Sequence, residues 1–351
     1  LGVLPGGYRS DALAVNGRGQ VVGTSNVADR TRHVFLWQNG TMIDLGAAPG
    51  VIGINKRGQV VIPAWRHAVM WDKGVSRRLP LMARAFNDAG QVAGLIRLSN
   101  GGHHAALWSK GRLRDLGTLG GLQSEAVAIN HRGLIVGTSE TTSGASHGFL
   151  WRNGKIIDLG TLGGQASEVW SGVTDGTTIN ERGQIVGVSQ TKTGTWHAFL
   201  WQNGTMADLG IGVPELGLDT IYAINERGQV LVSTDKSSVV CNKGKTTRLG
   251  TLGGNCTQPE GFNDLGDIVG ASCVPPAKPT LQGTPHAFIW EGGVITDLGR
   301  SARGPNTSRA YAVNNQRQIV GATETGEIVK PGTSTQTAVQ HAVLWTRSSG
   351  G

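Results

Sequence analysis

Charged and aromatic side chains recur at two fixed positions before a repeated asparagine. Five residues before it stand Asp11, Glu125, Asp175 and Arg309, and three residues before it stand Arg84, Tyr222, Glu260 and Tyr311. Two carboxylates can act as general acid and base on a glycosidic bond. A tyrosine or histidine beside an arginine can instead abstract a proton next to a carboxylate that the arginine neutralises. These positions are therefore the first candidates for chemistry.

The candidate residues form two groups. The catalytic candidates are Glu125 and Asp175 as a carboxylate pair, and Tyr222 or His103 with Arg84 as a lyase-type set. The ligand-binding candidates are Asp11, Trp65, Arg66, His103, Trp170, Trp196, Glu260, Arg309 and Tyr311. Aromatic and charged side chains gathered near one opening are typical of a small-molecule or carbohydrate site, although side chains solvated around a wet channel would give the same pattern. No G-x-S-x-G, H-E-x-x-H or Walker sequence supports catalysis.

The asparagine belongs to a repeat that runs through the whole chain. It occurs in I-N-x-x-G-Q phrases at Asn16, Asn55, Asn87, Asn130, Asn180, Asn225, Asn263 and Asn314. Each copy holds four short runs rich in β-branched and aromatic residues; in 124–160 they are EAVAIN, LIVGTS, HGFLW and KIIDLG. Gly, Asn, Asp and Ser separate the runs, as in tight hairpins. Four antiparallel strands at a period of about 44 residues predict a propeller blade.

The ends of the chain suggest how the blades close. The last copy stops after its third run, and the first residues, LGVLPGG, match the D-L-G-T-L-G-G segment that ends other copies. We therefore predict a single all-β domain over 1–351: an eight-bladed β-propeller of four-stranded antiparallel blades, closed by the N-terminal strand completing the last blade. Seven blades is the alternative, because copies 2, 6 and 8 lack D-L-G, the repeated Trp or the turn glycine.

Most letters of the repeat predict scaffold. Seven histidines stand four residues before the repeated Trp: His33, His67, His104, His147, His197, His286 and His341. Equivalent positions of successive blades lie too far apart to share an ion, so we expect no metal site. We expect each histidine to pair with the aspartate that ends the fourth run. The asparagine should shape the hairpin after the first run.

The chain has three cysteines. Cys241 replaces the repeated Trp of copy 6 and should lie in the core. Cys256 and Cys273 flank a hairpin whose turn is N-D-L-G, and antiparallel pairing across that turn places them opposite each other. We predict a disulfide between them, although a register slip of one residue would separate the two side chains.

Variation between copies is concentrated in the loops between the second and third runs. They span 25–32, 139–146, 189–196, 271–285 and 322–340 and differ in length and composition, whereas the other hairpin turns are short and nearly constant. Variable loops on a rigid scaffold commonly carry binding sites. The functional face should therefore be the one that carries these loops.

Charge and hydropathy limit the classes of partner that we expect. The net charge is +8, but the basic residues are spread along the repeats without a Lys/Arg run, so no nucleic-acid partner is expected. No apolar run approaches the roughly 18 residues of a membrane span. We expect no cofactor and a monomer. Because the chain starts at Leu1 without Met, we expect a removed leader and an extracellular or periplasmic location.

The motifs H-A-F-L-W-x-N-G, D-L-G-T-L-G-G and S-x-A-x-x-I-N-x-x-G-Q-I-V-G recur in fixed order. In these motifs the chain resembles the HAF family of bacterial extracellular repeats, which implies export and a propeller-type fold but no single activity. We therefore predict an exported binder of a carbohydrate or other small polar ligand at the variable-loop face, near the mouth of the central channel. The alternatives are an enzyme there (a lyase, glycosidase or natural-product cyclase) and a protein-interaction scaffold.

Overall fold

The computed structural model describes residues 1–169, 177–213, 221–234, 237–275, 283–299, 307–329 and 337–346. The described residues form β-strands and no helix, in eight antiparallel sheets that correspond to the eight copies of the repeat. The fold is the predicted eight-bladed β-propeller. By contact, the chain divides into two compact units: Leu1–Ile62 with Arg248–Gly351, and Pro63–Thr247. No helix among the described residues is long and apolar enough to cross a membrane.

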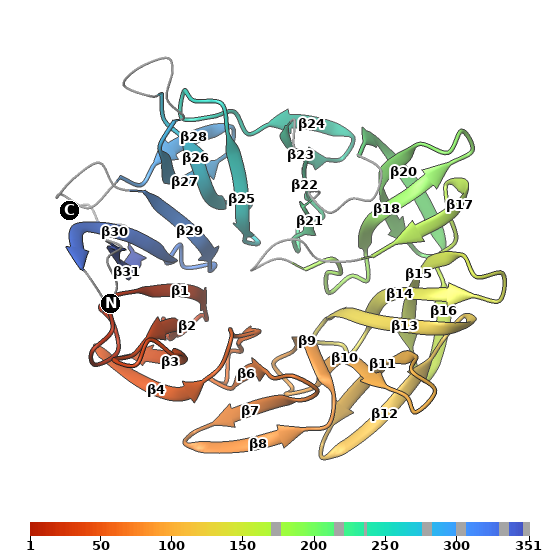
Figure 1. Cartoon of the computed structure of the whole chain (residues 1–351). Coiled ribbons are helices and arrows are strands. Elements are labelled where there is room, and N and C mark those ends of the chain that lie inside the picture. The colour runs from red at the N-terminus through yellow and green to blue at the C-terminus, as the bar shows by residue number, and fades with distance from the viewer. Residues whose placement is uncertain are drawn as a thin grey trace. The chain divides into compact units, whose positions relative to one another are not determined.

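Each sheet follows chain order from its first to its last strand (Figure 1). Three sheets belong wholly to the first unit: β1 (Ser10–Val15), β2 (Val21–Asn26), β3 (Arg32–Gln38), β4 (Thr41–Ala47); β25 (Thr257–Phe262), β26 (Ile268–Cys273), β27 (Pro285–Glu291), β28 (Val294–Asp297); and β29 (Ser308–Val313), β30 (Ile319–Val329), β31 (Thr337–Trp345).

Three further sheets belong wholly to the second unit: β9 (Met82–Phe86), β10 (Val92–Arg97), β11 (His103–Ser109), β12 (Arg112–Gly117); β13 (Gly120–Ile129), β14 (Ile135–Thr141), β15 (Ser146–Arg152), β16 (Lys155–Asp158); and β17 (Gly163–Glu168), β18 (Ile185–Thr191), β19 (Trp196–Gln202), β20 (Thr205–Gly212). The remaining two sheets are β5 (Gly53–Ile54), β6 (Val60–Pro63), β7 (Ala68–Asp72), β8 (Val75–Leu79); and β21 (Ile221–Ile224), β22 (Val230–Ser233), β23 (Ser238–Asn242), β24 (Lys245–Arg248).

The core lies between neighbouring sheets. The phenylalanine of each H-x-F segment is fully buried at Phe35, Phe149, Phe199 and Phe288. In the second unit, Leu150 and Leu159 of one sheet pack with Phe199 and Trp201 of the next. A single sheet cannot bury its own apolar faces, so each sheet is stabilised by packing against its neighbours.

The asparagines link neighbouring copies as well as shaping each hairpin. The Asn16 Oδ1 accepts from the backbone N–H groups of Arg18 and Gln20, at 2.9 and 3.1 Å, which confirms the predicted role in the turn. Its Nδ2 donates 2.9 Å to the carbonyl of Asn55 in the next copy. The same relay runs from Asn263 to Asn314 and from Asn314 to Asn16, and in the second unit from Asn87 through Asn130 and Asn180 to Asn225.

The predicted histidine–aspartate pairs are present in five copies. The Nδ1 atom lies 2.8 Å from the aspartate Oδ2 in His33–Asp44, His104–Asp115, His147–Asp158, His197–Asp208 and His286–Asp297. The same aspartate also accepts from the backbone two residues on, as Asp44 does from Gly46 at 2.8 Å. These pairs therefore hold the outer edge of their sheets.

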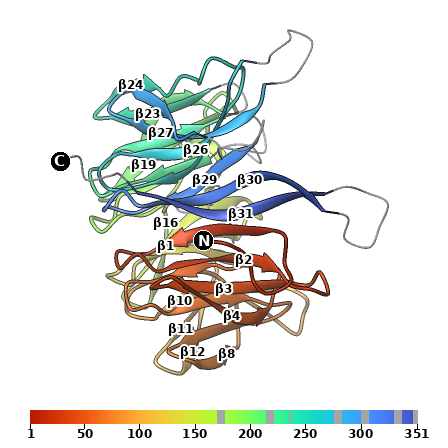
Figure 2. The ribbon, with the colours of Figure 1, turned by 90° about the vertical axis from the view of Figure 1, so that its left-hand side faces the viewer.

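The N-terminal segment lies against the last sheet, beside β31 (Figures 1 and 2). The Leu1 amino group donates 2.9 Å to the Ala342 carbonyl, and Gly2 pairs with Ala342. Leu4 is buried in the same core cluster as Ala342. The predicted closing segment is thus in place, held by single bridges next to a three-stranded sheet.

The cysteine predictions are confirmed. Cys256 and Cys273 form a disulfide with Cα atoms 5.1 Å apart, and the Cys273 N–H donates 3.0 Å to the Cys256 carbonyl. Cys241 is a free, buried cysteine in the core.

Candidate functional site

A serine at the start of the innermost strand sets the register of the candidate residues. Ser124 Oγ donates 2.6 Å to the Gly117 carbonyl and accepts 2.8 Å from the Ala105 N–H, so the strand is fastened to the preceding sheet. Ser10, Ser167 and Ser308 make equivalent contacts. The residue after each serine is Asp11, Glu125, Glu168 or Arg309. The serine therefore fixes where the first candidate position lies.

The second candidate position is a β-bulge. The ladders of β1, β13, β25 and β29 each shift by one residue, between Ala12 and Ala14, Ala126 and Ala128, Pro259 and Gly261, and Ala310 and Ala312. The skipped residue is the one three before the asparagine, such as Glu260 or Tyr311. A bulge leaves its residue out of the ladder and can re-aim its side chain. The candidate side chains are therefore placed by a repeated irregularity of the fold.

A glycine on the second strand lets the backbone of the first strand come very close to it. A Cβ on Gly137 would lie 1.9 Å from the Glu125 carbonyl oxygen, and one on Gly321 would lie 1.9 Å from that of Arg309. The glycine of the repeated I-V-G therefore serves the inner strand.

In the first unit, four side chains from the two positions meet two further polar side chains, Arg9 and Gln340. The Arg309 Nη1 donates 2.9 Å to Glu260 Oε1. The Asp11 carboxylate accepts from the Gln340 Nε2 at 2.6 Å and from the Tyr311 hydroxyl at 3.4 Å, and the Arg9 Nε lies 3.6 Å from it. We call Arg9, Asp11, Glu260, Arg309, Tyr311 and Gln340 the inner-strand cluster.

Burial and charge determine what the inner-strand cluster can do. Glu260 is only 9% exposed, and the Arg309 side chain is 37% exposed. Burial, together with the Asp11 charge, raises the pKa of Tyr311 to about 12. The phenol therefore stays protonated at neutral pH and acts as a hydrogen-bond donor, which is opposite to the state a general base needs.

In the second unit, Arg84 and Glu125 form an ion pair between adjacent inner strands. Arg84 is the residue skipped by the ladder of β9. Arg84 contacts Glu125 in the same way as Tyr311 contacts Asp11. In both pairs, a bulge residue contacts the residue five before the asparagine of the following copy. Both predicted residues are thus together, as an ion pair rather than as separate catalytic groups.

Glu168 is a site residue that the sequence analysis missed. It pairs opposite Val188 as Glu125 pairs opposite Thr138, and a Cβ on Gly187 would lie 2.2 Å from its carbonyl oxygen. Counting back from Asn180 instead led to Asp175, because this copy has more residues between its serine and its asparagine. The S-E pair shared by 124–125 and 167–168 was the signal. Asp175 itself lies outside the described residues.

Thr138, which pairs opposite Glu125, bonds to the backbone of Val169, the residue after Glu168. The Thr138 hydroxyl accepts from the Val169 N–H and donates to the Val169 carbonyl, both at 3.1 Å. Burial raises the pKa of Glu168 above 4.5. The second unit therefore carries one carboxyl group paired with an arginine and one with an increased proton affinity.

The other predicted residues are more dispersed. Trp65 is 84% exposed and Arg66 is exposed in the loop before β7. His103 begins β11, and Trp196 packs partly buried against a core cluster. Trp170 lies outside the described residues, as does the side chain of Tyr222 on β21. Among the described residues, no group of three or more His, Cys, Asp or Glu side chains could hold a metal ion.

Comparisons with known proteins agree on the fold alone. No family model and no curated protein matches the chain. Among solved structures, the chain is similar to an acylaminoacyl peptidase of Pyrococcus horikoshii, with a TM-score of 0.50 and 12% identity over 97% of this chain and 51% of that chain.

Two further structures are similar at lower scores. A puromycin-hydrolyzing peptidase of Mycobacterium tuberculosis gives a TM-score of 0.48 and 14% identity, covering 90% of this chain and 57% of that one. The extracellular domain of a one-component system of B. thetaiotaomicron gives 0.46 and 10%, covering 96% and 47%. The chain thus spans about half the length of these proteins.

Proposed function

We propose that this protein is an exported β-propeller that binds a carbohydrate or another small polar ligand at the variable-loop ends of its inner strands. The observation that carries the proposal is the inner-strand cluster. The repeat requires serine, glycine and asparagine on these strands, whereas charged residues and a tyrosine at the intervening positions satisfy no need of the scaffold.

The composition of the inner-strand cluster favours a polyhydroxyl ligand. The carboxylates of Asp11 and Glu260 accept hydrogen bonds, and Tyr311 and Gln340 donate them. Two arginines balance the two carboxylates, so the cluster carries no net charge. A neutral sugar offers donors and acceptors in equal measure and needs no counter-charge. The loop between β2 and β3, Val27–Thr31, begins directly beside this end of β1.

Two observations support export. A disulfide such as Cys256–Cys273 persists in oxidising compartments. The recurring H-A-F-L-W and D-L-G-T-L-G-G motifs resemble those of the HAF extracellular repeats, and we infer membership of that family.

The test is a glycan array probed with the labelled full chain, followed by calorimetry on the best oligosaccharide. Asp11→Asn and Tyr311→Phe should each weaken binding by about tenfold, the effect of one lost hydrogen bond of about 1.4 kcal/mol. Arg152→Gln, an exposed arginine of β15, serves as the control and should leave affinity unchanged. Equal binding by all four proteins would refute this site.

A second candidate function rests on Glu168. Glu168, whose pKa is raised by burial, and Glu125 lie on the first strands of neighbouring sheets. Glycosidases use two carboxyl groups, one of them an acid with a raised pKa. Glu168 would donate the proton, and Glu125, paired with Arg84, would be its partner. If so, the full chain should hydrolyse aryl glycosides, and Glu168→Gln should remove that turnover. Absence of turnover over the whole panel would exclude this candidate without affecting the binding proposal.

A further inference from the structure

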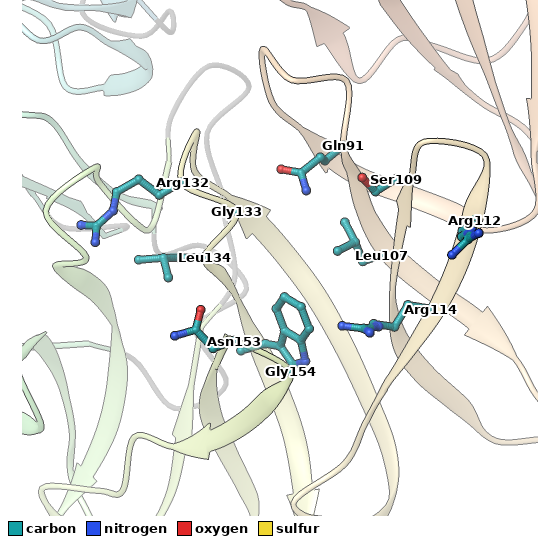
Figure 3. Close-up of a pocket in the computed structure, with 11 residues that line it drawn as sticks. Gln91, Leu107, Ser109, Arg112, Arg114, Arg132, Gly133, Leu134, Asn153 and Gly154 are labelled. Carbon is teal, nitrogen blue, oxygen red and sulfur yellow. The ribbon is translucent and has the colours of Figure 1, made fainter.

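A cavity of about 600 Å³ lies between the sheets β9–β12 and β13–β16 of the second unit. It is lined by residues of the short turns, such as Arg132 and Asn153, and therefore lies at the end of the strands opposite Glu125. Figure 3 shows its lining side chains. Its size is that of a small-molecule pocket.

The cavity is strongly basic. Arg112, Arg114 and Arg132 line it, and no aspartate or glutamate does. None of the three arginines forms an ion pair with a residue in the described part of the chain. Arg112 and Arg114, two residues apart on β12, lie on one side of this space, whereas the Arg132 guanidinium points away from them (Figure 3). A guanidinium group attracts an anion and can donate two parallel hydrogen bonds to an oxyanion.

Two of the arginines have contacts that hold their guanidinium groups, Arg114 with a residue that lines the cavity and Arg132 with the next copy. The Arg114 guanidinium lies 5.8 Å from the centroid of the Trp151 ring, over its face. The Arg132 Nη1 donates 3.0 Å to the backbone carbonyl of Glu181. These contacts orient the guanidinium groups and use few of their five N–H donors.

Departures from the repeat create the space. In two other copies the glutamine after the turn bonds to a second glutamine, Gln20 to Gln38 at 2.7 Å and Gln184 to Gln202 at 3.0 Å. Here the partner position holds the shorter Ser109. The Gln91 Oε1 accepts 2.8 Å from Asn87, and its amide nitrogen, without a partner among the described residues, points into the cavity (Figure 3).

The floor of the cavity is apolar. Leu134 stands where most copies have glutamine, and it lies with Leu107 against the cavity while each is at most 8% exposed. A ligand here would meet hydrocarbon on one side and guanidinium groups on the other. A small hydrated ion such as chloride would gain no stabilisation from contact with these apolar side chains.

We propose that this cavity binds a small organic anion. Its carboxylate or phosphate group lies beside Arg112 and Arg114 and accepts their N–H groups and that of Gln91. Its apolar body covers Leu107 and Leu134. This site is separate from the inner-strand cluster and does not depend on the carbohydrate proposal.

The probes are benzoate and phenyl phosphate, with benzyl alcohol as the neutral match, titrated calorimetrically into the full chain at low salt. Binding of at least one anion, about tenfold tighter than benzyl alcohol and weakened by added salt, is expected. Arg112→Gln and Arg114→Gln should each reduce affinity by about tenfold, equivalent to about 1.4 kcal/mol.

Arg77→Gln is the matched control. The Arg77 guanidinium lies over the Trp108 ring at 6.0 Å, as Arg114 lies over Trp151, but Arg77 does not line the cavity. This variant should keep full affinity. Arg112→Gln gives a second test, because Arg112 is exposed and its loss leaves the core intact. Binding of neither anion, equal binding of benzyl alcohol, or equal loss in Arg77→Gln would overturn the proposal.

Discussion

Replacing Arg317 by glycine restores the repeat but should destabilise the protein. Arg317 occupies the turn position that is glycine in the other seven copies, and its φ is 59°. Its Nε donates 2.9 Å to Oδ2 of Asp267 and its Nη2 3.3 Å to Oδ1. Asp267 is 2% exposed and replaces the usual glutamine of the preceding copy. The two departures therefore compensate each other.

The magnitude follows from two opposing terms. A non-glycine residue in the left-handed region costs about 1 kcal/mol, which Arg317→Gly recovers. Removing one partner of a buried ion pair costs about 3 kcal/mol at the low end of the range, appropriate because the Arg317 side chain is 35% exposed. The net loss should be about 2 kcal/mol. Arg317→Ala keeps the strain and should lose about 3 kcal/mol.

The assay is urea unfolding followed by both tryptophan fluorescence and circular dichroism, with free energies compared where the two curves coincide. The double variant Asp267→Gln/Arg317→Gly should return to within about 1 kcal/mol of the parent, because it restores the glutamine that accepts from the asparagine in other copies. A single variant Arg317→Gly as stable as the parent would show that backbone strain dominates, and would refute the compensation.

Three further outcomes are expected. The phenol of Tyr311, with a pKa of about 12 in the folded protein against 10.0 unfolded, makes stability fall between those pH values, and Tyr311→Phe should remove that slope and the latest step of an ultraviolet tyrosine titration. Because burial raises the pKa of Glu168, the stability that its protonated form supplies is complete below pH 4.5 and is lost as pH rises; Glu168→Gln should exceed the parent in urea at pH 7 and equal it at pH 4. Serine at both Cys256 and Cys273, 17 residues apart, should cost about 3 kcal/mol of unfolding free energy, a loss that reductant reproduces in the parent alone.

The fold could be predicted from the sequence because the same four-strand pattern occurs in eight copies. A copy that departs from the repeat, such as copy 6 with Cys241 in place of Trp, can be assigned by aligning it with the other copies. The disulfide was predicted by pairing residues across the turn, and Cys256 does lie opposite Cys273. The ladder pairs Phe262 with Ile268 next to the turn, and the bulge at Glu260 then shifts it into the register of the cysteines.

The candidate site was less accessible, because its geometry depends on backbone irregularities. The position three residues before the asparagine could be identified from the sequence, but nothing in the sequence shows that this residue forms a β-bulge. Counting from the asparagine also fails where a copy has extra residues between its serine and its asparagine, and so Glu168 was missed. Counting from the preceding G-T-L-G-G would have found it.

The contacts show why single copies are a poor unit for predicting function here. Tyr311 reaches Asp11 of the next copy, Arg309 reaches back to Glu260 and Arg84 reaches Glu125. Arg317 likewise compensates a change in the copy before it. Because each departure acts on a neighbour, a residue that breaks the repeat gains meaning only beside the adjacent copy. Side chains that differ together across one sheet-to-sheet boundary are therefore the ones to test first, as at the cavity between Gln91 and Leu134.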